Sequence, residues 1–424
     1  MLLIKNGRVI DPARKKERNA DIVVKDGKIE KIYAEGTLPA EAEAAANQVL
    51  DAKGLVVAPG LVDVHVHFRD PGLTYKEDIH TGAAAAAKGG FTTVVCMANT
   101  KPIVDNEETL RYVLEEGKKT GIHVLSCAAI SKGFEGKERT DMEGLLKAGA
   151  AGFTDDGIPL MDGPFVKEAM EEAARLGTVL SFHEEDKTFI KQNGINHGKV
   201  SDQLGIYGSP ALAEDSLVAR DCMIALATGA KIDIQHISSG HSVEMVRLAK
   251  KMGAHVWAEV TPHHFTLTED AVLEHGTLAK MNPPLRTEWD RQMLIEGLKD
   301  GTIDMIATDH APHSKEEKEK PLTEAPSGIT GLETAFSVCN TYLVQTGKLT
   351  PMQLVDRMSK APAEIYGLTD RAVQAGNFAR LVLLDWDTEK VYETYKSKGI
   401  NTPYTGKKLT GSPKAIVTGT KVTE

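Results

Sequence analysis

The chain has 424 residues and a formal net charge of -10, with 41% hydrophobic and 26% charged residues. This length predicts two domains, or one large domain with a smaller addition. The acidic balance argues against a nucleic-acid partner, and no apolar run approaches the ~18 residues needed to cross a membrane. A small anionic ligand is not excluded, because a local cluster of histidine, arginine and metal can reverse the field.

Cysteine usage and the first residues indicate the cell compartment. The four cysteines are far apart, none lies in a CxxC pair, and the start shows no signal-peptide layout. We therefore expect reduced thiols in a cytoplasmic protein.

The two ends of the chain share a pattern of short strands and turns. It covers residues 2–10, 20–34 and 48–60, and returns in 380–387 and 414–422. We predict a small β-sandwich domain built from both termini, residues 1–55 and 366–424, whose C-terminal strands begin after about Asp370. Residues 56–365 would form the catalytic domain between them.

In this middle region, strand-like segments alternate with helix-like ones, several of which end in glycine. Eight strands followed by helices predict an α/β fold, a TIM-like (β/α)8 barrel. A doubly wound open sheet is the structural alternative, although no GxGxxG motif is obvious. The strand-like segments are 61–67, 91–98, 122–130, 150–156, 178–184, 231–238, 254–262 and 303–310.

The first of these strands carries an unusual set of polar residues, in the stretch VDVHVHFRD at 62–70. Alternation would place Asp63, His65 and His67 on one face and the valines on the other. We expect the histidines to face the barrel mouth, the valines to face the helices, and Asp63 to lie deeper as support.

Further polar residues follow the other strands. Active sites of such barrels lie at the carboxyl ends of the strands, so these side chains should meet. One histidine at a strand end is usually an ordinary polar residue, but a whole set at one edge indicates a site. The set is His65, His67, Asn99, Asp155, Asp156, His183, His236 and Asp309.

Imidazole and carboxylate groups without thiolates suit Zn, Mn, Co or Fe. Four histidines and two aspartates exceed the three protein ligands of a mononuclear catalytic zinc. They suit two metals ~3.5–4 Å apart that share a hydroxide and a bridging carboxylate.

Motifs along nearly the whole chain resemble those of the amidohydrolase superfamily, and as a set those of bacterial class I dihydroorotases. ATDHAPH and HVH alone indicate a cyclic amidohydrolase, whereas MANTKP and KMNPPLR make the resemblance more specific. The motifs are HVHFRDPG (65–72), MANTKP (97–102), GFTDDG (152–157), SFHEE (181–185), EVTPHHF (259–265), KMNPPLR (280–286) and ATDHAPH (307–313).

The resemblance implies two Zn²⁺ ions per subunit. His65 and His67 would bind one metal and His183 and His236 the other, with Asp156 and a hydroxide bridging them. Asp309 would bind the first metal and act as the catalytic base. Asp155 is expected to be a turn or supporting residue.

The implied reaction is the reversible hydrolysis of dihydroorotate to N-carbamoyl-aspartate in pyrimidine biosynthesis. Asp309 would take the hydroxide proton and pass it to the departing ring nitrogen. Arg69 can grip a substrate carboxylate through two hydrogen bonds. The other implied substrate contacts are His67, Asn99, Asn282, His313 and main-chain groups at Ser327 and Gly328, where relatives often carry a residue bulkier than this serine.

Two other functions stay open. A hydantoinase or allantoinase would usually carry a carboxylated lysine at the bridging place, and GFTDDG has none. A non-catalytic barrel subunit of a transcarbamoylase complex would be expected to lose metal ligands, and none is missing. We expect a homodimer, and an active enzyme could also bind aspartate transcarbamoylase.

Two features beside the motifs are weaker. His263 and His264 are expected to be supporting or structural residues. Residues 314–327 read as a solvated loop, and a lid over the site is a further hypothesis because of the loop's position.

Overall fold

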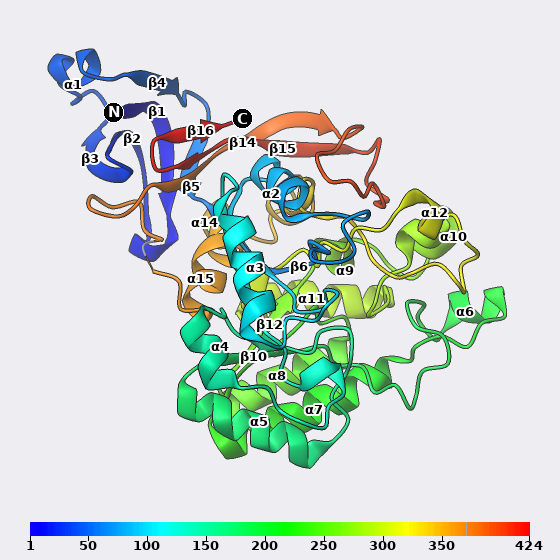
Figure 1. Ribbon diagram of the computed structural model, residues 1–424. Coiled ribbons are helices and arrows are strands. Elements are labelled where there is room, and N and C mark those ends of the chain that lie inside the picture. Colours follow the sequence, from blue (N-terminus) through cyan, green and yellow to red (C-terminus); the bar gives the residue numbers. More distant parts are fainter. Residues whose placement is uncertain (370) are drawn as a thin grey trace.

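The computed structural model describes residues 1–369 and 371–424. Asp370, near which we predicted the C-terminal strands to begin, lies outside the described residues. Within the described residues, no helix is both long enough and apolar enough to cross a membrane. The central body is ringed by helices, and a sheet lies at one end of it (Figure 1).

Parallel strands form a closed barrel in this central body. Strands β6 to β8 form one sheet and β9 to β13 another. Two bridges join the sheets, from Ala128 to Phe153 and from Val66 to His310. This closure confirms the predicted barrel and excludes the doubly wound open sheet. The strands are β6 (Leu61–Val66), β7 (Phe91–Cys96), β8 (His123–Ser126), β9 (Phe153–Thr154), β10 (Val179–Phe182), β11 (Lys231–Ile234), β12 (Val256–Val260) and β13 (Met305–Ile306).

Helices lie between the strands, and capping residues mark where they begin and end. The glycines at several C-terminal ends were predicted from the sequence. The Asp78 side chain accepts from the main chain of Thr81 at the start of α2, and the left-handed Gly177 ends α5. The longer helices are α2 (Ile79–Lys88), α3 (Glu107–Lys118), α4 (Met142–Ala148), α5 (Gly163–Leu176), α7 (Ala211–Thr228), α8 (Gly240–Met252) and α11 (Glu288–Asp300). The shorter ones are α1 (Ala40–Ala44), α6 (Lys199–Leu204), α9 (Pro262–Thr266), α10 (Ala271–His275), α12 (Lys315–Lys318), α13 (Ala335–Cys339), α14 (Pro351–Val355) and α15 (Ala361–Ile365).

Both ends of the chain contribute strands to one separate sheet, in which β5 pairs with β1 on one side and β14 on the other. The N- and C-terminal strands therefore lie side by side (Figure 1). The predicted domain limits stay a prediction. Strand β5 belongs to this sheet, although it begins one residue after the limit that we placed at residue 55. The strands are β1 (Leu2–Asp11), β2 (Lys16–Lys25), β3 (Lys28–Ala34), β4 (Gln48–Asp51), β5 (Val56–Pro59), β14 (Arg380–Val391), β15 (Lys408–Thr418) and β16 (Lys421–Thr423).

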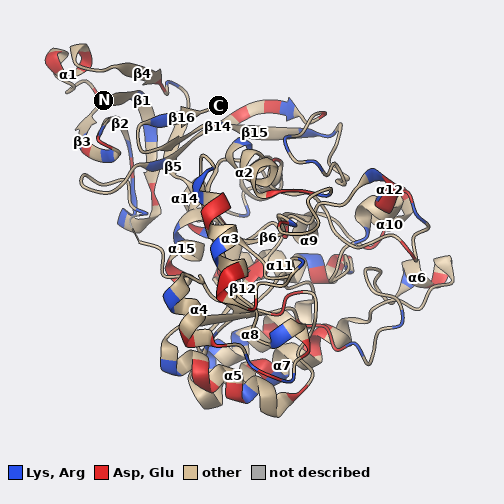
Figure 2. Ribbon diagram, viewed as in Figure 1, with Lys and Arg blue, Asp and Glu red and all other residues tan. Residues whose placement is uncertain are grey.

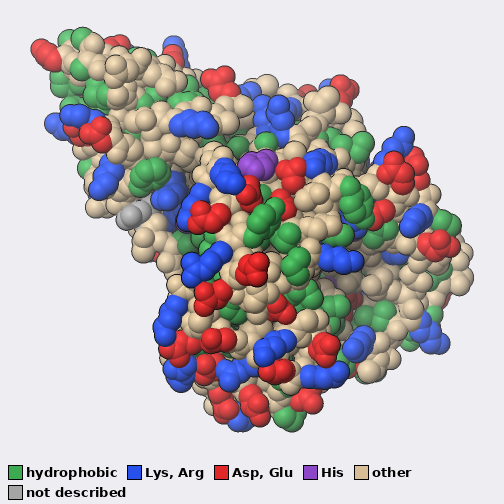
Figure 3. All heavy atoms as spheres, in the orientation of Figure 1, with side chains coloured by type: hydrophobic (Ala, Val, Ile, Leu, Met, Phe, Trp, Pro, Cys, Tyr) green, Lys and Arg blue, Asp and Glu red, His purple; other side chains and the backbone are tan. Residues whose placement is uncertain are grey.

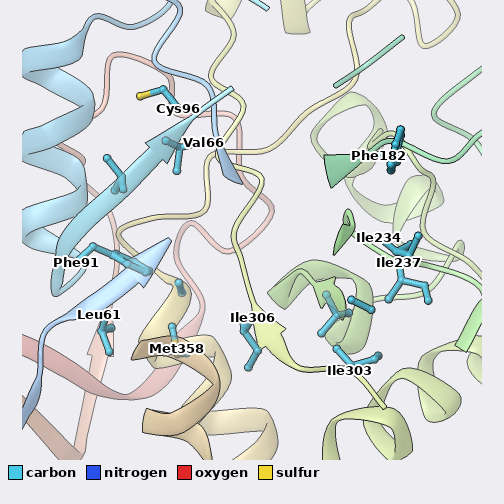
Figure 4. Close-up of a cluster of buried hydrophobic side chains, with 14 of the residues drawn as sticks. Leu61, Val66, Phe91, Cys96, Phe182, Ile234, Ile237, Ile303, Ile306 and Met358 are labelled. Carbon is cyan, nitrogen blue, oxygen red and sulfur yellow. The ribbon is translucent and has the colours of Figure 1, made fainter. Parts of the chain in front are cut away.

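Apolar side chains from the strands and helices fill the space around the barrel. Figure 4 shows Leu61 and Phe91 on adjoining strands, with Ile306 and Met358 nearby. Charged side chains of both signs are mixed over the outer helices and the visible face (Figures 2 and 3). The excess of acidic residues is thus not gathered into one acidic patch on that face.

Strand β6 departs from the simple alternation that we predicted. Val62 and Val64 pack with Met97 and Met305 in one cluster, whereas Val66 belongs to the larger cluster around the barrel. The pairing of β6 with β7 is irregular between Asp63 and Val66. The expectation that all three valines face the helices is therefore wrong, because an irregular strand does not keep two constant faces.

Candidate metal centre and substrate cavity

The predicted ligands meet at the carboxyl ends of the barrel strands, and all of them are buried. Each follows or ends a different strand, apart from the two histidines of β6. They are His65 and His67 at β6, Asp156 after β9, His183 after β10, His236 after β11 and Asp309 after β13.

Asp156 lies at the centre of this cluster. Its Oδ1 atom is 3.4 Å from His65 Nε2, and its Oδ2 atom is 3.4 Å from His67 Nε2. The same Oδ1 atom is 3.7 Å from His183 Nδ1 and 3.6 Å from His236 Nε2. One carboxylate therefore faces four imidazoles.

The cluster fits two metal ions that share this carboxylate. The cluster contains two triads, and within each triad the possible ligand atoms lie within 4.8 Å of one another. One triad is made of His65, His67 and Asp156, and the other of Asp156, His183 and His236. The buried Nε2 atom of His65 has no hydrogen-bond partner, so it has an open coordination position. Asp309 Oδ1 lies 2.9 Å from His67 Nε2 and 3.5 Å from His65 Nε2, on the side of the first triad.

The electrostatics of the cluster favour added positive charge. Burial lowers the pKa of His183, but Asp156 and Glu185 outweigh burial and raise this pKa to about 10. Burial also acts against ionised Asp156, yet the neighbouring imidazoles hold its pKa well below the ordinary value. Metal cations would supply the positive charge that these carboxylates stabilise.

Three residues of the site have backbones in the left-handed region. The φ angles are 60° at Arg69, 33° at His236 and 48° at Asp309. Residues other than glycine rarely adopt such φ values, and the exceptions gather at functional sites. Here they set the direction in which the strand ends present their side chains.

Glu259 is a supporting residue that the sequence reasoning missed. Its Oε1 atom lies 2.5 Å from His65 Nδ1 and accepts from the main-chain N–H of His236 at 3.1 Å. One carboxylate therefore orients ligands from both triads. The available signal was the glutamate that begins the EVTPHHF motif, near the end of an apolar strand.

The neighbouring aspartates serve the main chain. Asp63 accepts from the N–H groups of His65 at 3.1 Å and Thr308 at 3.2 Å. Asp155 accepts from the N–H groups of Ile130 at 2.7 Å and Ser131 at 3.0 Å. Both hold strand ends in place, in keeping with the supporting roles expected for them.

A cavity of about 410 Å³ opens above the cluster. His65 does not line it, since this side chain is fully buried beneath. The other expected ligands and all the expected substrate contacts do: His67, Arg69, Asn99, Asp156, His183, His236, Asn282, Asp309, His313, Ser327 and Gly328.

Two of the polar residues in this wall also orient ligands. His67 Nδ1 donates to Asn99 Oδ1 at 2.9 Å, while Asn99 Nδ2 donates to Asp156 at 3.4 Å. Asn282 Nδ2 lies 3.3 Å from His183 Nε2. These amides therefore hold the ligands from the cavity side.

His313, which lines the same cavity, is held in its neutral form. Burial lowers its pKa to about 2, and the charges of Arg69 and Lys76 act in the same direction. The neutral ring donates from Nε2 to the Ser327 carbonyl at 2.8 Å. The Ser327 hydroxyl oxygen is buried without a hydrogen-bond partner and packs against Gly194, where an added Cβ would lie 2.2 Å from it.

Residues 314–327 are more firmly held than a solvated loop would be. Lys280 Nζ donates to the carbonyls of Leu322 at 2.8 Å and Ala325 at 2.7 Å. Lys318 Nζ donates to Pro326 at 2.9 Å. Part of the loop lines the cavity, and its role as a lid stays a hypothesis.

His263 and His264 belong to neither triad, although both are buried. His264 Nε2 donates to the carbonyl of Pro283 at 2.9 Å, beside Asn282, and its Nδ1 pairs with the Thr261 hydroxyl at 2.8 Å. His264 thus holds the loop that carries Asn282.

Sequence comparisons place this chain among known proteins. The family described as Dihydro-orotase-like matches residues 54–242. A dihydroorotase from Clostridioides difficile is 58% identical over 411 residues, which cover 97% of this chain and 96% of the relative. A dihydroorotase from Clostridium acetobutylicum is 48% identical over 424 residues, covering 100% of this chain and 99% of the relative.

Solved structures with the same fold include other cyclic amidases. The L-hydantoinase (dihydropyrimidinase) from Arthrobacter aurescens matches with a TM-score of 0.88 and 26% identity. The match covers 99% of this chain and 95% of that protein.

The Glu259 contacts predict a change in metal affinity. Glu259→Gln should lower that affinity about 10- to 100-fold, because losing a carboxylate partner weakens the orientation and basicity of an imidazole ligand. Metal titration of the purified protein measures this change. The exposed Glu288→Gln is the matched control, and equal affinities in the two variants would contradict the role given to Glu259.

Proposed function

This chain belongs to the dihydroorotase family, and we propose that the cluster at the barrel mouth performs the family's reaction. The enzyme is a cyclic amidohydrolase that converts dihydroorotate to N-carbamoyl-aspartate and back, a step of pyrimidine biosynthesis. The observation that carries the assignment to this cluster is Asp156, shared by four imidazoles below a cavity that Arg69 lines.

We assign the cluster to two Zn²⁺ ions. His65, His67 and Asp309 would hold one, His183 and His236 the other, and Asp156 both. The nitrogen and oxygen donors suit zinc. When bound, the metals would lower the pKa of a water molecule and polarise the ring carbonyl.

Asp309 is the proposed catalytic base. Burial acts against its ionised form, but the imidazoles of His65 and His67 outweigh burial and hold its pKa below the ordinary value. The carboxylate is therefore ionised at neutral pH, which is the form that can accept a proton from water and pass it to the ring nitrogen. Its place in the cavity wall puts it within reach of a bound ring.

Arg69 is the proposed partner of the substrate carboxylate. Its side chain is half-buried and lines the cavity, with Nε donating to the carbonyl of Pro312 at 3.3 Å. Its remaining guanidinium N–H groups can bind a carboxylate in a bidentate manner. Asn282, neutral His313 and main-chain groups at Ser327 and Gly328 surround the rest of the cavity and can bind the polar edges of the ring.

A hydantoinase-like cyclic amidase is the alternative, since a hydantoinase shares the fold. Asp156, in the place where hydantoinases usually have a carboxylated lysine, favours the dihydroorotase. The four free, buried cysteines support a cytoplasmic location. The homodimer and the association with aspartate transcarbamoylase stay predictions.

Substrate comparison tests the function directly. The purified enzyme should open dihydroorotate with at least about 100-fold higher kcat/KM than hydantoin or allantoin, because only dihydroorotate offers Arg69 a carboxylate. Metal content is measured on the same sample. Turnover of hydantoin without turnover of dihydroorotate would overturn the assignment.

Removal of the base should stop the chemistry. Asp309→Asn should lower kcat about 10²- to 10⁴-fold, the usual contribution of general acid–base catalysis. The rates are compared in samples of matched metal content, because Asp309 is also a proposed ligand. A kcat near that of the unchanged enzyme would remove Asp309 from this role.

The substrate carboxylate gives a separate prediction. Arg69→Gln should raise KM for dihydroorotate about 10- to 100-fold, since a charge-assisted hydrogen bond contributes about 1.5–3 kcal/mol. Steady-state kinetics measure the change, and the exposed Arg175→Gln is the control. Equal KM values for both variants would exclude Arg69 as the carboxylate partner.

A further inference from the structure

A segment of the small domain reaches the barrel mouth. Residues 397–401, called here the 397–401 segment, lie between β14 and β15. The Ser397 hydroxyl and the main-chain N–H of Lys398 both donate to the buried carboxylate of Glu77, close to the loop that carries Arg69. At Gly399 an added Cβ would lie 2.7 Å from the Pro312 side chain, so this segment packs directly against the wall of the cavity.

Asn401 ends this segment with a fully paired side chain that is 3% exposed. Its Oδ1 atom accepts from the main-chain N–H of His313 at 3.0 Å. Its Nδ2 group donates to the carbonyls of Ala311 at 3.1 Å and Gly328 at 3.0 Å. Its own carbonyl accepts from the N–H of Thr330 at 3.0 Å.

These partners belong to the two walls that carry proposed substrate contacts. Residues 311–313 form one wall and 327–328 the other, and His313 Nε2 also joins them by donating to Ser327 O. Asn401 binds both walls from behind with one rigid amide. Asn401 itself is not among the described residues that line the cavity.

We propose that Asn401 is a positioning residue that sets substrate affinity by fixing the spacing of these walls. The inference rests on the proposed function of the cavity. Without the amide, the buried carbonyl of Ala311 and the N–H of His313 each lose this partner, which is costly in the interior. The Gly328 carbonyl keeps Lys318 Nζ at 3.1 Å, and the Ala311 N–H keeps the carbonyl of Ile329 at 2.8 Å. Loss of the amide would therefore shift the two walls relative to each other without detaching them.

The chain offers a matched control in Asn340. This side chain is fully buried, and its Nδ2 group donates to the carbonyls of Trp386 and Thr410, both at 2.9 Å. Asn340→Ala therefore removes the same kind of hydrogen bonds, between the central body and strands β14 and β15, without touching either wall. Loss of stability alone would affect both variants.

Steady-state kinetics at matched metal content give the test. Asn401→Ala should raise KM for dihydroorotate at least about tenfold and change kcat less than about threefold. Asn340→Ala should leave KM within about twofold. A KM for Asn401→Ala within twofold of the unchanged enzyme, an equal rise in Asn340→Ala, or a fall in kcat alone would overturn the proposal.

A second variant keeps the test decisive if Asn401→Ala does not fold. Asn401→Asp keeps the size and the acceptor for His313, but it turns a carboxylate oxygen toward the carbonyls of Ala311 and Gly328. The same rise in KM is expected, and an unchanged KM would overturn the proposal. Failure of the unchanged enzyme to turn over dihydroorotate would instead contradict the proposed function.

Discussion

Four imidazoles converge on the buried carboxylate of Asp156, at distances of 3.4–3.7 Å. Such a cluster can be buried only if charge is compensated and the groups are held in place. The strand ends come together because the barrel closes, through one bridge from Val66 to His310 and another from Ala128 to Phe153. The fold and the buried cluster are therefore a single constraint, and metal cations would complete its charge balance.

The residues around this centre act in layers. Glu259 and Asn99 orient the imidazoles from below and from the cavity side. Lys280 holds the loop that follows the last barrel strand, and Asn401 joins the two walls of the cavity. The small domain thus takes part in the site, because its 397–401 segment supports the surface against which a substrate would lie.

Motif residues were predictable because their chemistry is unusual for their position. One histidine at the end of an apolar strand is usually an ordinary polar residue, but several of them, such as His65 and His183, at one edge of a barrel indicate a site, and parallel strands bring their ends to that edge. Asn282 could be proposed only through the resemblance, whereas Arg69 was singled out by its own chemistry, a guanidinium directly after the first strand that can grip a carboxylate. Glu259 escaped notice because a single glutamate in a strand carries no spacing signal. The irregularity of β6 escaped as well, because alternation of valine and polar residues predicts a regular strand.

By itself, the sequence determined the fold class, the sheet shared by both chain ends, and the set of candidate ligands, since strand periodicity and residue chemistry are local properties of the chain. The resemblance implied that Asp156 would lie between the four histidines, but only the tertiary structure gave the distances of 3.4–3.7 Å at which it meets them. It also decided that Lys280 and Lys318 would be buried against carbonyls, and that Asn401 would reach the walls of the cavity. These contacts join residues far apart in the chain, and their geometry depends on barrel closure and on the docking of the small domain.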